Sequence, residues 1–112
     1  MADRPTISTH VLDAETGRPR QGVVVQVEFL PPNIDDSTDL DEPEGGITDE
    51  DGRIRTLVNG PLRTDGHYMI TFTVEGPFFQ EVSISFQIDD PTRSYHVPLL
   101  LAPYSLTTYR GS

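Results

Sequence analysis

Hydrophobic and polar residues alternate with a period of two along most of this chain. One face of residues 23–29 carries three Val and a Phe, and the same alternation recurs in residues 68–75 and 82–89. Because successive side chains of a β-strand point to opposite faces, this pattern predicts half-buried strands. Shorter candidate strands are residues 7–13, 54–58, 95–101 and 105–109, with a weaker candidate near residues 46–48.

Turn residues separate these candidates, with an Asp-Gly turn in "DEDGR" and further breaks at "NGP", "TDGH", "EGP" and "DDP". No stretch of ten or more residues has a helical period. Seven or eight short strands with frequent turns predict an all-β fold, a two-sheet β-sandwich. At 112 residues, the whole chain (1–112) is expected to form a single domain.

The negative charge is concentrated in one segment. Nine of the 18 acidic residues fall between Asp35 and Asp51 with no basic residue among them, and all eight basic residues of the chain are Arg. Residues 31–51 are therefore interpreted as an acidic loop. The spacing does not fit an EF-hand, which needs Gly at its sixth position, where Glu44 stands when counting from Asp39. An acidic surface also disfavours a nucleic-acid partner.

Composition narrows the function classes further. The chain has no Cys, no apolar stretch of signal-peptide length near its start and no run of about 20 apolar residues. We therefore expect no membrane association and a cytoplasmic location. Since a domain this small buries a modest core, association with other copies is expected to stabilise it.

Two histidines stand out by their position. His10 and His96 each fall on the polar face of a predicted strand, opposite its apolar residues. Their ordinary pKa of about 6.5 suits proton transfer near neutral pH. Arg53 follows the Asp-Gly turn, whereas Arg55 and His67 are interpreted as surface residues. Three His without Cys fall short of a typical zinc site, and no G-x-S-x-G nucleophile motif is present.

Three stretches carry a family resemblance: "STHVLD", "TDEDGR" and the terminal "YHVPLLLAPYSLTTYRGS". They resemble the transthyretin-related family, and more narrowly its 5-hydroxyisourate hydrolase branch. The resemblance implies a transthyretin-like sandwich and a homotetramer, a dimer of dimers with active sites in a channel between the dimers. The family helix would fall in "EGPFFQE", which is so short that we expect the helix to be shortened or lost. Ser105, Leu106 and Thr107 also depart from the usual family residues.

The resemblance also implies roles for individual residues. The catalytic residues would be His10, Arg53, His96 and Ser112, and the substrate-binding residues would be His10, Arg53, Tyr109 and Arg110. Arg110 has an alternative role, in which it anchors the terminal segment by an ion pair. No cofactor and no metal are implied, because the histidines would activate water for attack on a cyclic amide.

The implied activity is hydrolysis of 5-hydroxyisourate to 2-oxo-4-hydroxy-4-carboxy-5-ureidoimidazoline, a step of urate degradation. Two other classes of function stay open. One is a transthyretin-like carrier that binds small ligands without catalysis. The other is a β-sandwich interaction module whose acidic loop contacts a partner.

Overall fold

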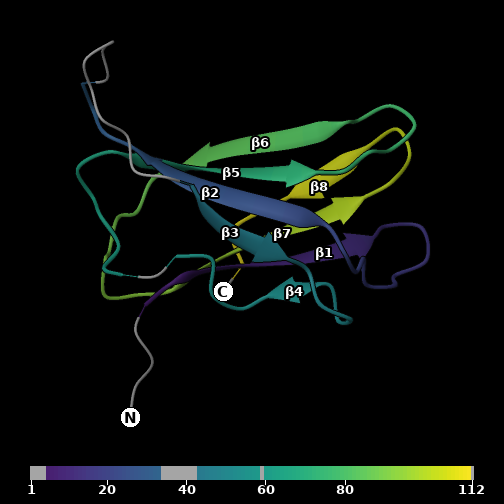
Figure 1. Ribbon diagram of the computed structural model, residues 1–112, viewed down its shortest axis with the longest axis horizontal. Helices are drawn as coiled ribbons and strands as arrows, with labels where there is room; N and C mark the ends of the chain where they lie inside the picture. Colours follow the sequence, from purple (N-terminus) through teal and green to yellow (C-terminus); the bar gives the residue numbers. More distant parts are fainter. Residues whose placement is uncertain (1–4, 34–42, 59, 112) are drawn as a thin grey trace.

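Two four-stranded sheets form the structure, a computed structural model that describes residues 5–33, 43–58 and 60–111. The first sheet has the order β4-β1-β7-β8 and the second β3-β2-β5-β6, and Figure 1 shows them as two stacked layers. The strands are β1 (Ile7–Asp13), β2 (Val24–Leu30), β3 (Glu44–Ile47), β4 (Arg53–Ile54), β5 (His67–Thr73), β6 (Glu81–Phe86), β7 (Tyr95–Leu101) and β8 (Leu106–Thr108).

One pairing decides where the functional residues lie. Strands β1 and β7 run parallel along their full length, from Ile7 opposite Tyr95 to Asp13 opposite Leu101, whereas every other strand pair is antiparallel. Strands 88 residues apart in sequence thus lie side by side at the centre of the first sheet. Strands β6 and β8 form edges of the two sheets.

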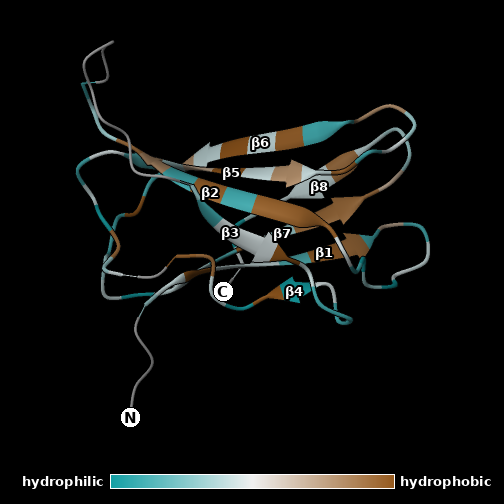
Figure 2. Ribbon diagram, in the orientation of Figure 1, coloured by the Kyte–Doolittle hydropathy of each residue, from teal (hydrophilic) through white to brown (hydrophobic). Residues whose placement is uncertain are grey.

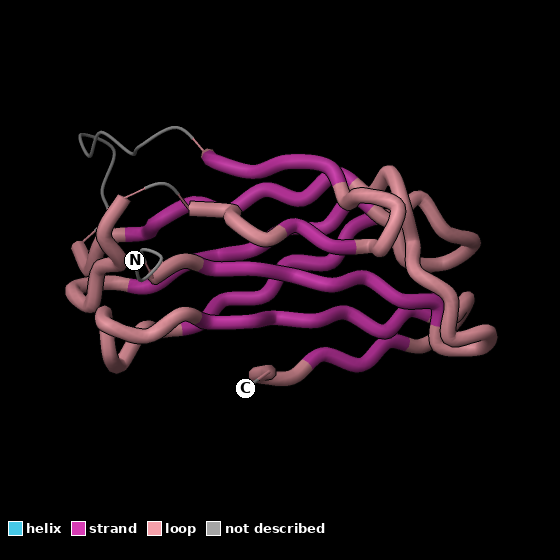
Figure 3. The backbone as a smooth tube through the Cα atoms, turned by 90° about the horizontal axis from the view of Figure 1, so that it is seen from below, coloured by secondary structure: helices cyan, strands magenta, loops and turns pink. Residues whose placement is uncertain are grey.

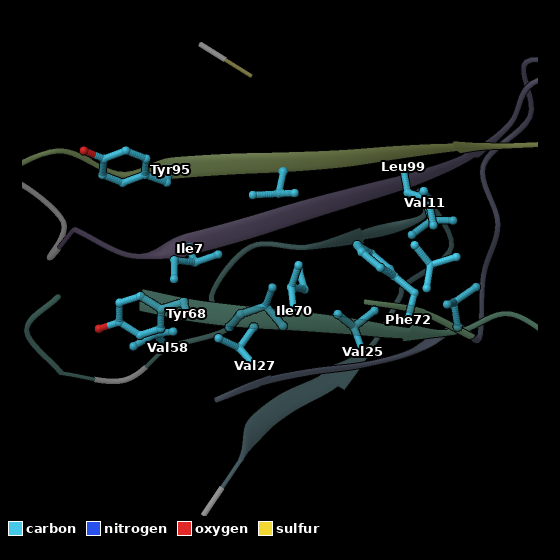
Figure 4. Close-up of a cluster of buried hydrophobic side chains, with 14 of the residues drawn as sticks. Ile7, Val11, Val25, Val27, Val58, Tyr68, Ile70, Phe72, Tyr95 and Leu99 are labelled. Atoms are coloured by element: carbon cyan, nitrogen blue, oxygen red, sulfur yellow. The ribbon is translucent and has the colours of Figure 1, made fainter. Parts of the chain in front are cut away.

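The core lies between the sheets, where side chains from both layers meet (Figure 4). Along β1, Ile7, Thr9 and Val11 are buried and the residues between them are not, so the predicted alternation is confirmed. Brown apolar positions recur along the strands in Figure 2, interrupted by polar ones. Among the described residues, no buried side-chain N or O atom lacks a hydrogen-bond partner.

The predicted all-β two-sheet sandwich is confirmed. Strands β5 and β6 end at Thr73 and Phe86, earlier than the predicted residues 75 and 89, and two short strands differ more from the sequence prediction. The strand expected at residues 54–58 is only Arg53–Ile54, because these are the two residues of this segment that pair with β1. Strand β3 begins at Glu44 within the segment interpreted as a loop, since Gly45 and Gly46 pair with β2. Residues 34–42 of that acidic segment lie outside the described residues.

The connection between β5 and β6 is a tight turn. Val74 N–H donates to Gln80 O (2.9 Å), and Gly76 N–H donates to Phe79 O (3.0 Å). Figure 3 shows strands and loops and no helix in the described chain, so the expected loss of the family helix is confirmed there. The same residues accordingly include no helix long and apolar enough to cross a membrane.

Candidate active site

His10 and His96 lie on the outer face of the first sheet, directed away from the core. In β1 and β7 the neighbours of each histidine, Thr9, Val11, Tyr95 and Val97, are buried, whereas the histidines are half-buried. Ser8 is opposite His96 in the parallel pairing, and His10 is opposite Pro98. Because side chains two residues apart share a face, Ser8, His10 and His96 lie together, and we call this surface the histidine face.

The Asp-Gly turn adds Arg53 to the histidine face. Arg53 is paired with His10 across the antiparallel β1–β4 contact, so their side chains share a face. The Asp49 carboxylate accepts hydrogen bonds from the N–H groups of Arg53 and Asp51, both 2.9 Å long, and these bonds lower its pKa. Gly52 has φ = 73° and packs against the Val11 carbonyl oxygen, where a Cβ would collide. The Asp49 carboxylate and the absence of a side chain at Gly52 are therefore both needed to bring Arg53 beside His10.

The ring of His10 is fixed by the same turn. Its Nε2 lies 2.9 Å from the carbonyl oxygen of Asp51. A carbonyl only accepts hydrogen bonds, so Nε2 carries the proton and donates it. Nδ1 is then the His10 nitrogen that remains for a ligand.

The ring of His96 is held on two sides. Its Nδ1 forms a hydrogen bond with the Ser8 hydroxyl (2.9 Å). On the other side, Gly111 N–H donates to His96 O (2.7 Å), and the two residues form a β-bridge. A Cβ on Gly111 would lie 2.7 Å from Cδ2 of the ring. The described residues leave Nε2 of His96 without a hydrogen bond.

The environment of His96 favours its neutral form. Burial lowers the pKa of His96 below its usual 6.5, and the nearby positive charges of His10 and Arg53 lower it further. His96 is therefore available as a proton acceptor near neutral pH.

The Arg53 guanidinium is available for an anionic ligand. It is exposed and makes no hydrogen bond or ion pair with any residue that the structure describes. It borders an open cleft of about 620 Å³, which we call the arginine cleft. This cleft is lined by Thr6, Ser8, Thr9, Arg53, Ile54, Arg55, Thr56, Ser94 and His96. A hydroxyl-rich cleft with two Arg and a neutral His suits a polar ligand with carbonyl oxygens.

The terminal segment continues the β7–β8 register beyond β8. Leu99 is opposite Thr108, and the bridge between His96 and Gly111 keeps the same register. By that register Tyr109 lies opposite Pro98 on the histidine face, and its side chain is exposed. Arg110 lies on the opposite face.

Contacts on that opposite face hold Arg110. Its guanidinium lies over the Tyr95 ring, 4.8 Å from the centroid, and its Nη2 is 3.9 Å from Oδ1 of Asp89. The Tyr95 hydroxyl donates to the same carboxylate, and this bond is the main reason that the pKa of Asp89 is lowered. We call Asp89, Tyr95 and Arg110 the tail clamp. The structure thus brings His10, Arg53, His96 and Tyr109 to one face and leaves Arg110 off it.

Of the predicted site residues, Ser112 lies outside the described residues. The sequence analysis did not identify three supporting residues, which are Ser8, Asp49 and Asp89. Ser8 stands two positions before His10, so the period-two pattern could have identified it as a neighbour on the same face. Asp49 could have been identified from turn chemistry. The role of Asp89 depends on tertiary contact alone. Among the described residues no group of three or more His, Asp or Glu side chains is arranged to bind a metal ion.

Known proteins share both sequence and fold with this chain. Residues 7–111 match the model of the HIUase/Transthyretin family. A 5-hydroxyisourate hydrolase of Salmonella dublin is 38% identical over 114 residues, which cover 95% of this chain and 80% of the relative. The solved structure of Klebsiella pneumoniae 5-hydroxyisourate hydrolase superposes with a TM-score of 0.76 at 32% identity, covering 96% of this chain and 99% of that one.

The same fold occurs in a transthyretin that was solved with a bound ligand. Sea bream transthyretin in complex with thyroxine superposes with a TM-score of 0.75 at 25% identity, covering 94% of this chain and 93% of that one. The family match spans residues 7–111 and is supported by relatives that are 38% and 32% identical to this chain. This chain therefore belongs to the HIUase/Transthyretin family.

Proposed function

We propose that this protein hydrolyses 5-hydroxyisourate to 2-oxo-4-hydroxy-4-carboxy-5-ureidoimidazoline in urate degradation. Water adds to the carbonyl carbon of a cyclic amide, the ring C–N bond breaks, and the released nitrogen takes up a proton. The observation that carries the proposal is the meeting of His10, Arg53 and His96 on one face. The named 5-hydroxyisourate hydrolases of Salmonella dublin and Klebsiella pneumoniae support the choice of substrate.

In this proposal His96 is the general base. Its lowered pKa keeps it neutral at the working pH, and its Nε2 has no partner among the described residues. Nε2 takes a proton from water while the oxygen attacks the carbonyl carbon. A positioned acid–base group of this kind contributes about 10²–10⁴-fold to the rate.

His10 and Arg53 handle the charge that the attack creates. Arg53 stabilises the developing oxyanion through its planar guanidinium, which is free to bind two substrate oxygens. His10 faces the substrate through Nδ1, because Nε2 is committed to the Asp51 carbonyl. In its protonated form, His10 returns a proton to the leaving nitrogen.

The terminal segment completes the site. Tyr109 provides an exposed ring and hydroxyl against the flat heterocycle. Ser112 keeps the role that the family resemblance implies, closing the pocket as a catalytic residue. We assign Arg110 the anchoring role, because its contacts with Tyr95 and Asp89 support that alternative over direct substrate binding.

The proposal includes a homotetramer located in the cytoplasm. The edges of both sheets, β6 and β8, border a cleft of about 240 Å³ whose lining includes Ile84, Phe86 and Val97. Unpaired edge strands with apolar side chains favour pairing with another chain. Light scattering on the pure protein tests the tetramer, and cell fractionation tests the location.

A coupled assay tests the activity. Urate oxidase generates 5-hydroxyisourate from urate, and the ultraviolet decay of the product is followed with and without this protein. We expect micromolar protein to accelerate the decay and the His96→Asn variant to lose most of that acceleration. An unaccelerated decay with wild-type protein would exclude the hydrolase and favour the carrier function, for which thyroxine is the first ligand to test because sea bream transthyretin was solved with it.

A further inference from the structure

We propose that Ser8 is a positioning residue for this hydrolysis: its hydroxyl oxygen accepts a hydrogen bond from Nδ1–H of His96 and thereby directs the Nε2 lone pair toward the attacking water. The inference rests on the proposed function. It begins from the 2.9 Å contact between Ser8 Oγ and Nδ1 of His96, the only side-chain hydrogen bond that either residue makes within the described chain.

The backbone fixes this contact. Ser8 and His96 are direct partners in the parallel β1–β7 pairing, at the centre of the first sheet. The contact is partly buried, and the neighbours Ile7 and Thr9 are anchored in the core. The Ser8 hydroxyl is therefore delivered to His96 by the strand register and not by a mobile loop.

Gly111 limits the freedom of the ring from the other side. A Cβ at residue 111 would lie 2.7 Å from Cδ2 and 3.2 Å from Cγ of His96, so the backbone of Gly111 lies against that edge. With Ser8 at Nδ1 and Gly111 at Cδ2, the ring edge that stays open carries Cε1 and Nε2. A ring flip would exchange Nδ1 for Cδ2 and lose the bond to Ser8.

The chemistry decides the direction of the bond. A hydroxyl can donate or accept, but a general base that acts through Nε2 needs its lone pair there. The neutral ring must then carry its hydrogen on Nδ1 and donate it to Ser8 Oγ. When Nε2 takes a proton from water, the ring becomes a cation and the same bond becomes charge-assisted, so it strengthens as the reaction proceeds.

The first test reads the tautomer directly. Histidine ¹⁵N shifts in wild-type protein above the His96 pKa should show a protonated Nδ1 and an unprotonated Nε2. In Ser8→Ala, which removes the acceptor, the Nε2–H tautomer should gain population, and in Ser8→Thr the wild-type pattern should return. An Nε2–H tautomer in the wild type, or the same pattern in all three proteins, would overturn the proposal.

The second test measures turnover of 5-hydroxyisourate. Ser8→Ala should lower kcat about three- to tenfold, the value of one neutral hydrogen bond, with KM changed by less than about twofold. Ser8→Thr should restore kcat. The matched control is Ser83→Ala, which removes a hydroxyl bonded to Thr71 (3.0 Å) on the other sheet and should leave kcat unchanged.

The two tests separate the two proposals. An active wild-type enzyme whose kcat is unaffected by Ser8→Ala would reject the role of Ser8 and leave the proposed function intact. A wild-type protein without any turnover would reject the proposed function, whereas the tautomer measurement would still report whether Ser8 orients His96.

Discussion

The ring of His96 occupies the space that a side chain at residue 111 would need. Gly111 is bridged to His96 through backbone, with its N–H bonded to His96 O at 2.7 Å, and even a methyl group there would lie 2.7 Å from Cδ2. The terminal segment and the proposed general base are thus packed as one unit. A side chain added at residue 111 would therefore displace the ring of the proposed base.

Gly111→Ala should lower kcat by about tenfold to a hundredfold, because the ring must turn away from its position for proton transfer. Stability should change little, since the site is at the surface of the first sheet. The control is Gly46→Ala, whose added Cβ would meet only Ile54 side-chain atoms at 3.8 Å, an ordinary contact. Steady-state kinetics with thermal melts on both variants give the comparison, and equal activity of Gly111→Ala and wild type would contradict the packing.

An NMR titration of His96 should give a pKa below about 6.5, because burial and the positive charges of His10 and Arg53 disfavour its charged form. The acid limb of kcat/KM should follow it, so activity persists as the pH falls below 6.5 and is lost through the folded pKa. Between the two pKa values the unfolded chain binds more protons, so this group lowers stability as the pH falls through that window.

Arg53→Gln should raise the pKa of His96 toward 6.5, because it removes one of the two positive charges. Arg93→Gln changes the net charge equally, but Arg93 is not among the causes of the His96 shift, and it should leave that pKa unchanged. A His96 titration that is identical in wild type and Arg53→Gln would mean that the guanidinium does not act on the ring.

Arg53→Lys should lower kcat/KM by about tenfold to a hundredfold, since a point charge does not reproduce the planar fork that binds two oxygens. Arg55→Lys, in the same cleft, should lose less than about threefold. The assay is the decay of enzymatically generated 5-hydroxyisourate. Equal losses in the two variants would mean that the cleft needs positive charge and not the geometry of Arg53.

The tail clamp should act as a single unit. Asp89→Asn and Arg110→Gln should each lower kcat/KM about two- to fivefold, a modest effect because both side chains are largely exposed. The double variant should lose no more kcat/KM than either single variant. Asp65→Asn is the control, because it breaks the 2.7 Å Arg63–Asp65 ion pair in the connection between β4 and β5. Multiplying losses in the double variant would show that the two residues act independently.

Much of the fold follows from the sequence where one face of a strand is buried. Strands β1 and β7 have the predicted bounds, because an apolar face against the core specifies both extent and register. Strands β3 and β4 were poorly predicted. Gly45-Gly46 within β3 and Leu57-Val58 beyond the end of β4 do not alternate between apolar and polar residues. Pairing with distant strands therefore decides the length of β3 and β4.

The candidate site, like the fold, could be predicted from the sequence only in part. The outward direction of His10 and His96 follows from alternation, and the position of Arg53 follows from the Asp-Gly turn. The face on which Arg110 lies could not be read from its type, because it depends on the bridge that extends the β7–β8 register. Ser8 contacts His96 and Asp89 contacts Arg110, and a local sequence pattern does not predict contacts between separate segments.

The parallel pairing of β1 with β7 has a consequence for folding kinetics. Contacts such as Ser8–His96 and Thr9–Val97 join residues 88 positions apart, so the histidine face forms only after a very long loop has closed. Loop closure of this kind slows folding, and without β7 only His10 and Arg53, which pair across β1 and β4, can come together. A nascent chain emerging from the ribosome therefore cannot assemble the histidine face until β7 has been synthesised and docked beside β1.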